Sequence, residues 1–314
     1  MILLSHPAPN ALPPSLSAAA QAVCQRHHVR VIGQGTQTLL FCNGFNCNQQ
    51  VWNYLLPTLA TRYRLVLYDQ IGTGRADLSA YDPQKYATVQ GYVQDLLDIC
   101  QALGLQQVVV VGHSLGATIA LLAAIRAPRY FAKAILVAAS PCYLNEPGYY
   151  GGFERADLLA LVAEMDKDYR TWANLFALLM MGSEAHTSLG HELAGYFCES
   201  DATVARQAIN FTFFDDHRAA LPQAQLPILL VQSADDVAVP AEVNDYWLAH
   251  LPQAKLVTLS TTGHCPHMSA PREVLAAMQQ FLQEPATSGE KPAAPNWAGR
   301  AAGRLAAQLP LASY

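Results

Sequence analysis

The strongest chemical signal in the sequence is a serine flanked by glycines, in the run Gly112-His113-Ser114-Leu115-Gly116. The run follows an apolar stretch typical of a strand and precedes a pattern typical of a helix. G-x-S-x-G at a strand-to-helix turn is a nucleophile elbow, which exposes the serine hydroxyl on a sharp bend. The helix N-terminus behind it favours a developing negative charge. Ser114 is therefore the predicted nucleophile; the alternative is a glycine-flanked serine with no chemical role.

A serine hydroxyl needs a base that is held in place by a third group. In this architecture the acid and then the histidine follow the serine along the chain. Asp235 and Asp236 end one strand-like run, and His264 follows the last such run behind a glycine. We predict His264 as the base, with His267 as its rival, whereas chemistry alone leaves Asp235 and Asp236 open as the acid. His264 and His267 also have the spacing of a metal pair, but no third ligand is apparent, so no metal is predicted.

The tetrahedral intermediate of acyl transfer needs two backbone N–H donors for its oxyanion. Leu115, directly after the nucleophile, is one predicted donor. The other is Phe45, in the loop after the first central strand, where Gly44 permits a close turn. Without the serine motif this loop would be interpreted as an ordinary polar turn.

These residues need a scaffold of strands and helices. Short runs rich in Val, Ile and Leu do not alternate with polar residues, so they are predicted as strands buried on both faces of a mainly parallel sheet. Longer helix-like segments lie between them, which implies a doubly wound α/β sheet. Folding is predicted to begin at 28–32. The predicted strands are Thr38–Cys42, Arg64–Tyr68, Val108–Val111, Ala134–Val137, Ile228–Gln232 and Lys255–Leu259, and the helices Val51–Leu59, Thr88–Leu103, Leu115–Ala127, Ala241–His250 and Arg272–Phe281.

Residues 143 to about 217 interrupt this alternation with four helix-like stretches, at about 154–165, 168–181, 189–199 and 202–214. A helical insert between two strands is predicted to lie over one edge of the sheet as a lid. It is rich in aromatic residues; about half are needed to pack the helices, and the rest are available to line a pocket.

Three segments are predicted along the chain: a flexible leader at 1–25, one domain at 26–283 and a flexible tail at 284–314. The leader is rich in Pro, Ala and Ser, and the tail begins with a linker-like composition. Within the tail, Trp297–Leu311 is either a short helix or disordered.

Composition excludes several classes of protein. The chain is 52% apolar and 14% charged with a net charge of −5, which gives no reason to expect nucleic acid or an anionic membrane as partner. No apolar stretch approaches the roughly 18 residues that cross a bilayer. Seven cysteines without a C-x-x-C pair indicate free thiols in a reducing compartment, so the cytoplasm is predicted.

Gly72-Thr73-Gly74 lacks the rest of a dinucleotide fingerprint and is predicted as a structural loop, and no cofactor is expected.

Several motifs together resemble a known group: N-G-F-N-C-N-Q-Q-V-W (43–52), Y-D-Q-I-G-T-G (68–74), V-G-H-S-L-G-A (111–117), S-P-C-Y-L-N (140–145), Y-Y-G-G-F (149–153), A-D-D-V-A-V-P (234–240) and G-H-C-P-H-M-S (263–269). They are similar to the RsbQ-like bacterial stress-signalling hydrolases and the related plant karrikin and strigolactone receptor hydrolases. The resemblance covers about Arg26 to Leu282. It departs at two positions: Asn43 stands where histidine is common, and Asn46 where glycine is frequent.

The resemblance implies an α/β-hydrolase fold with a four-helix lid, and a triad of Ser114, His264 and Asp236 rather than Asp235. It implies Phe45 and Leu115 as oxyanion donors and an apolar pocket lined by Phe45, Tyr143, Phe153, Trp172, Phe176 and Phe213. Two functions compete. One is hydrolysis of a small, largely apolar ester or lactone through an acyl-serine. The other is a ligand-sensing module that activates a PAS-domain serine phosphatase.

Overall fold

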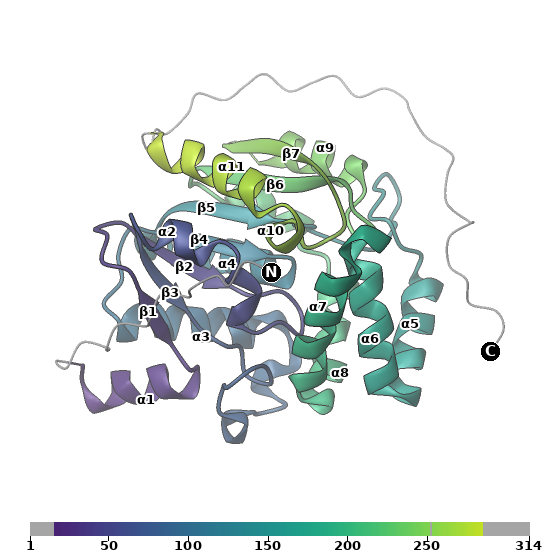
Figure 1. Cartoon of the computed structure of the whole chain (residues 1–314), viewed down its shortest axis with the longest axis horizontal. Coiled ribbons are helices and arrows are strands. Elements are labelled where there is room, and N and C mark those ends of the chain that lie inside the picture. The colour runs from purple at the N-terminus through teal and green to yellow at the C-terminus, as the bar shows by residue number, and fades with distance from the viewer. Residues whose placement is uncertain (1–15, 252, 285–314) are drawn as a thin grey trace.

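A seven-stranded sheet forms the centre of the computed structural model, which describes residues 16–251 and 253–284 (Figure 1). The strands run in the order β1-β3-β2-β4-β5-β6-β7, and only β1 is antiparallel to its neighbour. Every predicted strand is present. The bounds of the strands are β1 Arg30–Ile32, β2 Thr38–Cys42, β3 Arg64–Leu67, β4 Val108–His113, β5 Phe131–Val137, β6 Ile228–Asp235 and β7 Ala254–Thr262.

The continuous apolar runs are explained by burial on both faces of the sheet. All residues of β2 and β4 are buried, and these two strands pair in register, with Leu40 opposite Val110. Helices flank the sheet, and the helices of the lid gather at one end of it (Figure 1). The flanking helices are α1 Ala18–Arg26, α2 Leu56–Leu59, α3 Val89–Ala102, α4 Leu115–Arg126, α9 Ala241–His250, α10 Pro266–Ser269 and α11 Pro271–Gln283.

The lid contains the four predicted helices: α5 Arg155–Lys167, α6 Tyr169–Met181, α7 Thr187–Glu199 and α8 Ala202–Phe214. Two of them begin at an aspartate whose carboxylate accepts backbone N–H groups of the first turn: Asp168 for α6 and Asp201 for α8. Helix α6 ends at Gly182, whose left-handed backbone (φ 71°) is the usual glycine terminator. These local signals explain why the prediction of the lid helices is confirmed.

The predicted flexible leader is wrong over its last third, because Ala18–Arg26 forms helix α1. Ser17 caps its first turn through a bond from the Ala20 N–H (3.2 Å), and alanine-rich segments favour helix. The helix packs against α3 and buries Cys24. Its apolar face is short and gives little periodicity in the sequence. The sequence pattern therefore does not reveal the contact with α3 that stabilises this helix.

The predicted helix over Val51–Leu59 is also wrong in part. The structure has a 3-10 helix, η1 Gln49–Trp52, then a turn, and then the single turn of α2. Pro57 has no N–H to continue a helix from the preceding turn, which explains the break. The other 3-10 helices are η2 Leu78–Ala80, η3 Lys85–Ala87, η4 Pro128–Tyr130, η5 Glu184–His186 and η6 Arg218–Gln223.

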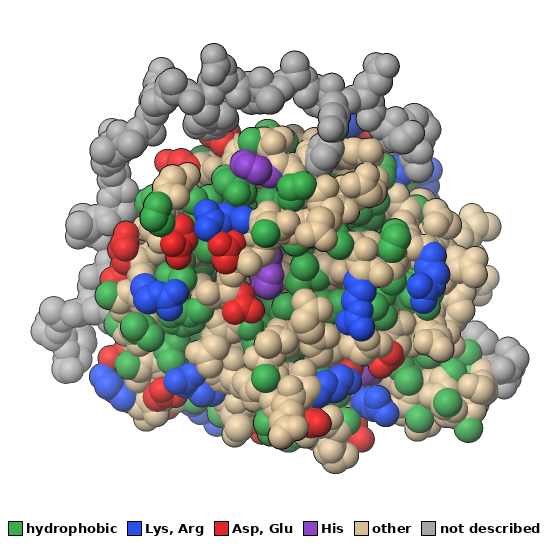
Figure 2. Space-filling view, turned by 180° about the vertical axis from the view of Figure 1, so that it is seen from behind, with side chains coloured by type: hydrophobic (Ala, Val, Ile, Leu, Met, Phe, Trp, Pro, Cys, Tyr) green, Lys and Arg blue, Asp and Glu red, His purple; other side chains and the backbone are tan. Residues whose placement is uncertain are grey.

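The surface fits the mild net charge. On the face shown in Figure 2, acidic and basic side chains are interspersed and form no large patch of one sign.

Among the described residues, no helix is long and apolar enough to span a membrane. All seven cysteines are free thiols, and six of them are buried. The predicted tail segment Trp297–Leu311 lies outside the described residues.

Candidate active site

Ser114 occupies a strained turn between β4 and α4. Its backbone (φ 53°, ψ −119°) lies in a region that side chains rarely adopt and that persists only where the surroundings impose it. The flanking glycines permit the turn. A Cβ on Gly112 would run into the backbone of Gly116, and one on Gly116 would meet the Cys42 carbonyl oxygen. The G-x-S-x-G pattern is thus a packing requirement around the predicted nucleophile.

Three side chains from distant parts of the chain form a continuous hydrogen-bonded row. The Ser114 Oγ lies 2.8 Å from His264 Nε2, and His264 Nδ1 lies 2.9 and 3.0 Å from the two carboxylate oxygens of Asp236. All three residues are buried. Ser114 does not cap α4 with its side chain, which leaves the hydroxyl to the histidine. The predicted triad is present.

The structure separates the two candidate acids. Asp235 is exposed, whereas Asp236 is buried beside the imidazole. One Asp236 oxygen also accepts the backbone N–H groups of Ala238 (2.8 Å) and Val239 (3.3 Å), which orient the carboxylate. The carboxylate can therefore hold the Nδ1–H tautomer of His264 and stabilise the imidazolium that forms when Nε2 takes a proton.

His267, the rival base, lies away from the serine in a layer beneath the triad. It is fully buried against Trp52 (ring centroids 4.7 Å apart) and His113 (4.3 Å). The His113 Nε2–H donates to the carbonyl oxygen of His264 at 2.9 Å. Burial lowers the pKa of His113 well below its usual range and that of His267 to about 3, so both rings are neutral. The ring nitrogens of His264 are hydrogen-bonded to Asp236 and Ser114, so neither is free to bind a metal together with His267. The described residues contain no cluster suited to a metal ion.

Because these histidine rings are buried and neutral, we expect the free energy of unfolding to fall in mild acid. Burial also lowers the pKa of His27, so His27, His113 and His267 are neutral in the folded chain at pH values where an unfolded histidine, with a pKa near 6.5, is protonated. The unfolded state then binds more protons, and the free energy of unfolding falls as the pH drops below about 6.5, by up to ~1.4 kcal/mol per pH unit for each histidine. Urea unfolding between pH 7.5 and 5 measures this slope.

The matched variant for that experiment is His267→Asn, which removes one titrating ring. Its free energy of unfolding should depend on pH less steeply than that of the wild type, by about 1.4 kcal/mol per pH unit. Equal slopes for the two proteins would show that His267 is protonated in the folded chain.

The loop after β2 is fixed by the residue that replaces the common histidine. The Asn43 side chain donates to the Tyr68 carbonyl oxygen (2.8 Å) and accepts from the Trp52 indole N–H (2.9 Å). Gln70 donates to the Asn43 carbonyl oxygen (3.1 Å). The asparagine is fully buried and bonded at both ends of its amide. The departure from the family pattern therefore leaves a rigid loop.

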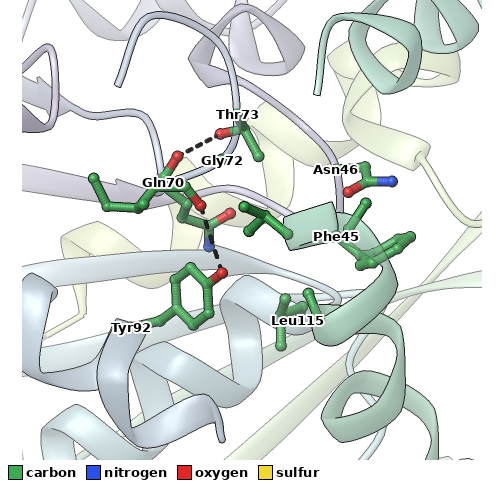
Figure 3. A pocket seen from close by; sticks show the side chains of 11 residues that line it. Phe45, Asn46, Gln70, Gly72, Thr73, Tyr92 and Leu115 are labelled. Atoms are coloured by element: carbon green, nitrogen blue, oxygen red, sulfur yellow. Dashed lines mark hydrogen bonds between the residues drawn. The ribbon is translucent and has the colours of Figure 1, made fainter. Parts of the chain in front are cut away.

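The second departure, Asn46, has a positive φ of 55°, a conformation that asparagine tolerates better than most residues. Its neighbour Phe45 and the first helical residue Leu115 both line a small cavity of about 10 Å³, large enough for one water molecule (Figure 3). Gln70, Thr73 and Tyr92 lie on its other side. Leu115 begins α4, so its N–H is among those without an intrahelical acceptor. The two residues predicted to supply the donors thus line one cavity.

The structure brings all six predicted pocket residues together in a group that we call the aromatic cluster: Phe45, Tyr143, Phe153, Trp172, Phe176 and Phe213. Phe213 is at its centre, with ring centroids 5.1 Å from Tyr143, 6.1 Å from Phe176 and 6.2 Å from Phe153. Phe45 contacts Phe213 and Trp172 edge-on. All members are buried except the half-buried Phe153. The rings pack against one another, and Tyr143 joins the cluster to the catalytic serine through its hydroxyl.

Two residues beside the triad had no role in the sequence-based prediction of the catalytic centre. One is His113, whose position inside the serine motif gives no hint of its bond to the His264 carbonyl. The other is Met180 of the lid, whose carbonyl oxygen accepts the His264 backbone N–H at 2.6 Å. Tyr143, predicted only as a pocket residue, has its hydroxyl 3.3 Å from the Ser114 Oγ. Burial raises the pKa of Tyr143, so the phenol stays protonated.

Comparison with known proteins places this geometry in a family. Residues 39–277 match the model of the Alpha/beta hydrolase family. Karrikin insensitive 2 receptor CA of Petunia hybrida is 34% identical over 259 residues (82% of this chain, 96% of the relative), and strigolactone esterase D14 of Arabidopsis thaliana is 36% identical over 257 residues (82% and 94%). A solved hydrolase from Oleispira antarctica, 34% identical, superposes with a TM-score of 0.83 over 86% of this chain and 99% of its own. With its elbow serine, its triad and its lid, the chain belongs to the α/β-hydrolase family.

Proposed function

We propose that this chain hydrolyses a small, largely apolar ester or lactone through an acyl-Ser114 intermediate. The observation that carries the proposal is the buried row of hydroxyl, imidazole and carboxylate, which contacts the aromatic cluster through Tyr143. The relatives support it, since one is named a strigolactone esterase. The proposed reaction uses side chains, backbone N–H groups and water.

The proposed reaction begins when His264 Nε2 takes the proton of Ser114 and the oxygen attacks the substrate carbonyl. The backbone N–H groups of Phe45 and Leu115 then donate to the oxyanion, a contribution typically worth 10²–10³-fold in rate for each donor. The imidazolium, stabilised by Asp236, returns its proton to the departing alkoxide. Water, deprotonated by the same nitrogen, releases the acid and restores Ser114.

The surroundings of Ser114 favour a small and apolar substrate. The aromatic cluster contributes apolar ring surface, and the adjoining cavity holds about one water molecule, so a substrate must enter by displacing rings or lid helices. Among the described residues, the buried Trp172 indole N–H has no hydrogen-bond partner. A buried donor without a partner is costly, so it is available to an ester or lactone oxygen.

A signalling role in the cytoplasm, as in the RsbQ-like group, is the second part of the proposal. Relatives named as karrikin receptors support it, and so do three exposed leucines on the outer side of the lid, Leu159, Leu175 and Leu179. In this role, ligand capture or slow turnover changes the lid, and the lid binds a PAS-domain serine phosphatase.

One set of assays tests both parts. We expect kcat/KM for p-nitrophenyl acetate and butyrate to exceed that for the palmitate ester by about tenfold or more, because a long chain would have to displace more of the buried aromatic cluster. Addition of the chain to a PAS-domain serine phosphatase should raise phosphate release. A preference for palmitate would contradict the small-substrate proposal, and an unchanged phosphatase rate would contradict the signalling role while leaving hydrolysis standing.

A further inference from the structure

The lid reaches the catalytic histidine through its backbone. The last turn of α6 has carbonyl oxygens without intrahelical partners, and one of them, on Met180, accepts the His264 N–H at 2.6 Å. The bond links the lid to the peptide that carries the imidazole.

Two facing glycines allow this close approach. Gly182, which ends α6, and Gly263, which precedes the histidine, both have positive φ values of 71° and 91°. A Cβ on Gly182 would lie 2.8 Å from the Gly263 Cα, and a Cβ on Gly263 would run into the Met181 carbonyl oxygen. The two backbones therefore touch with no side chain between them, and neither glycine can be enlarged without moving one segment.

The other contacts of this loop come from the sheet. The Gly263 N–H donates to the Asp235 carbonyl oxygen (2.7 Å), and the Ser233 hydroxyl donates to the Gly263 carbonyl oxygen (2.6 Å). The His113 ring fixes the His264 carbonyl from below. The loop is thus held between the sheet on one side and the end of α6 on the other.

We propose that the C-terminal turn of α6, through the Met180 carbonyl and Gly182, is a positioning element for His264. With α6 packed against the histidine loop, the imidazole lies within hydrogen-bonding distance of Ser114. When α6 moves away, the histidine loop loses its contact on the lid side and the base shifts from the nucleophile. Hydrolysis is then efficient only while the lid is closed over the substrate. This inference rests on the proposed hydrolysis for its kinetic test.

The test is Gly182→Ala, which drives a methyl group against the Gly263 backbone. We expect kcat for p-nitrophenyl acetate to fall at least about tenfold with KM changed less than about twofold, because sub-ångström misplacement of a catalytic group lowers the rate of chemistry. The matched control is Gly148→Ala. Gly148 has a similar φ of 76° but no atom within 4 Å of its Cβ position, so this variant has the backbone strain without the clash. Its kcat should stay near that of the wild type.

A second measurement covers the case in which Gly182→Ala does not fold. In the wild type, the free energy of opening from amide hydrogen exchange should be no higher for His264 than for the last turn of α6, because the His264 N–H loses its acceptor, the Met180 carbonyl, whenever that turn opens. Slower exchange at His264 than in α6 would overturn the inference, as would equal kcat for the Gly182 and Gly148 variants. If the wild type itself turns over no ester, the proposed hydrolysis fails instead, and the exchange rates still test the link between α6 and His264.

Discussion

Ser114→Ala should lower kcat/KM for p-nitrophenyl acetate by about 10⁴–10⁶-fold, the range found when the nucleophile of a triad is removed. No other hydroxyl replaces it at 2.8 Å from His264 Nε2 among the described residues. The proposed oxyanion donors and the aromatic cluster remain in the variant, so the residual rate reports what they contribute without a nucleophile. Initial rates at several substrate concentrations measure the loss.

The control for this variant is the removal of a nearby thiol, that of Cys265. Cys265 follows the catalytic histidine, and its sulfur lies 4.0 Å from His113 Nε2. Burial raises the pKa of this thiol well above its usual range, so it stays protonated and is a poor nucleophile. Cys265→Ala should keep activity near that of the wild type. A phosphonate inhibitor should add its mass to the wild type and to Cys265→Ala but not to Ser114→Ala. Retention of more than a tenth of the activity by Ser114→Ala would rule out the acyl-serine mechanism.

The sheet and the lid were predictable because their signals are local. Apolar runs such as Val108–Val111 mark strands that are buried on both faces, and Asp168 and Asp201 mark the starts of lid helices. Helix α1 was not predictable in this way, since its stability depends on a contact with α3, some 70 residues further along the chain. The broken segment before Pro57 shows a different limit: apolar spacing suggested one helix, whereas the proline in the first turn of α2 has no N–H to continue a helix from the preceding turn.

The catalytic centre was predictable to the extent that chemistry restricts residue order. A serine motif and a later acid and histidine could be placed along the chain, but the supports of those residues come from tertiary structure. The bonds of Asn43 to Tyr68 and Trp52 join three segments, and no local pattern predicts them. The contact of Met180 with His264 joins residues 84 positions apart, since 264 − 180 = 84. Sequence spacing contains no information about such a contact.

The aromatic cluster shows a different limit. Its six members could be named, but a sequence does not state how rings share space. In the structure the ring of Phe213 is surrounded by Phe45, Tyr143, Phe153 and Phe176, and the cavity lined by Phe45 and Leu115 is of water size. In the proposed mechanism a substrate enters by movement of the lid, and the proposed role of α6 transmits that movement to His264 through its bond with Met180. Binding and catalysis are linked by the same helix.

Asp236→Asn should lower kcat/KM for p-nitrophenyl acetate by about 10⁴-fold, as such a change does in other triads, while the fold is retained. The amide can still accept the Ala238 N–H through its oxygen, which turns the NH₂ group toward His264 Nδ1. A donor there favours the tautomer with its proton on Nε2, so the imidazole can no longer accept the proton of Ser114. Asparagine also carries no charge to stabilise the imidazolium. Initial rates from pH 6 to 9 measure the loss, and circular dichroism confirms the fold.

Asp235→Asn is the matched control, because it makes the same chemical change one residue away. The Asp235 side chain is exposed, and the chain uses only its backbone carbonyl to hold Gly263, which the substitution leaves in place. Activity within about twofold of the wild type is therefore expected, since surface changes of this kind usually have small effects. If Asp235→Asn instead lost activity and Asp236→Asn kept it, the acid would be the exposed one. The Ala238 and Val239 N–H groups would then stabilise only the loop after β6. That loop would have to rearrange to bring Asp235 to His264.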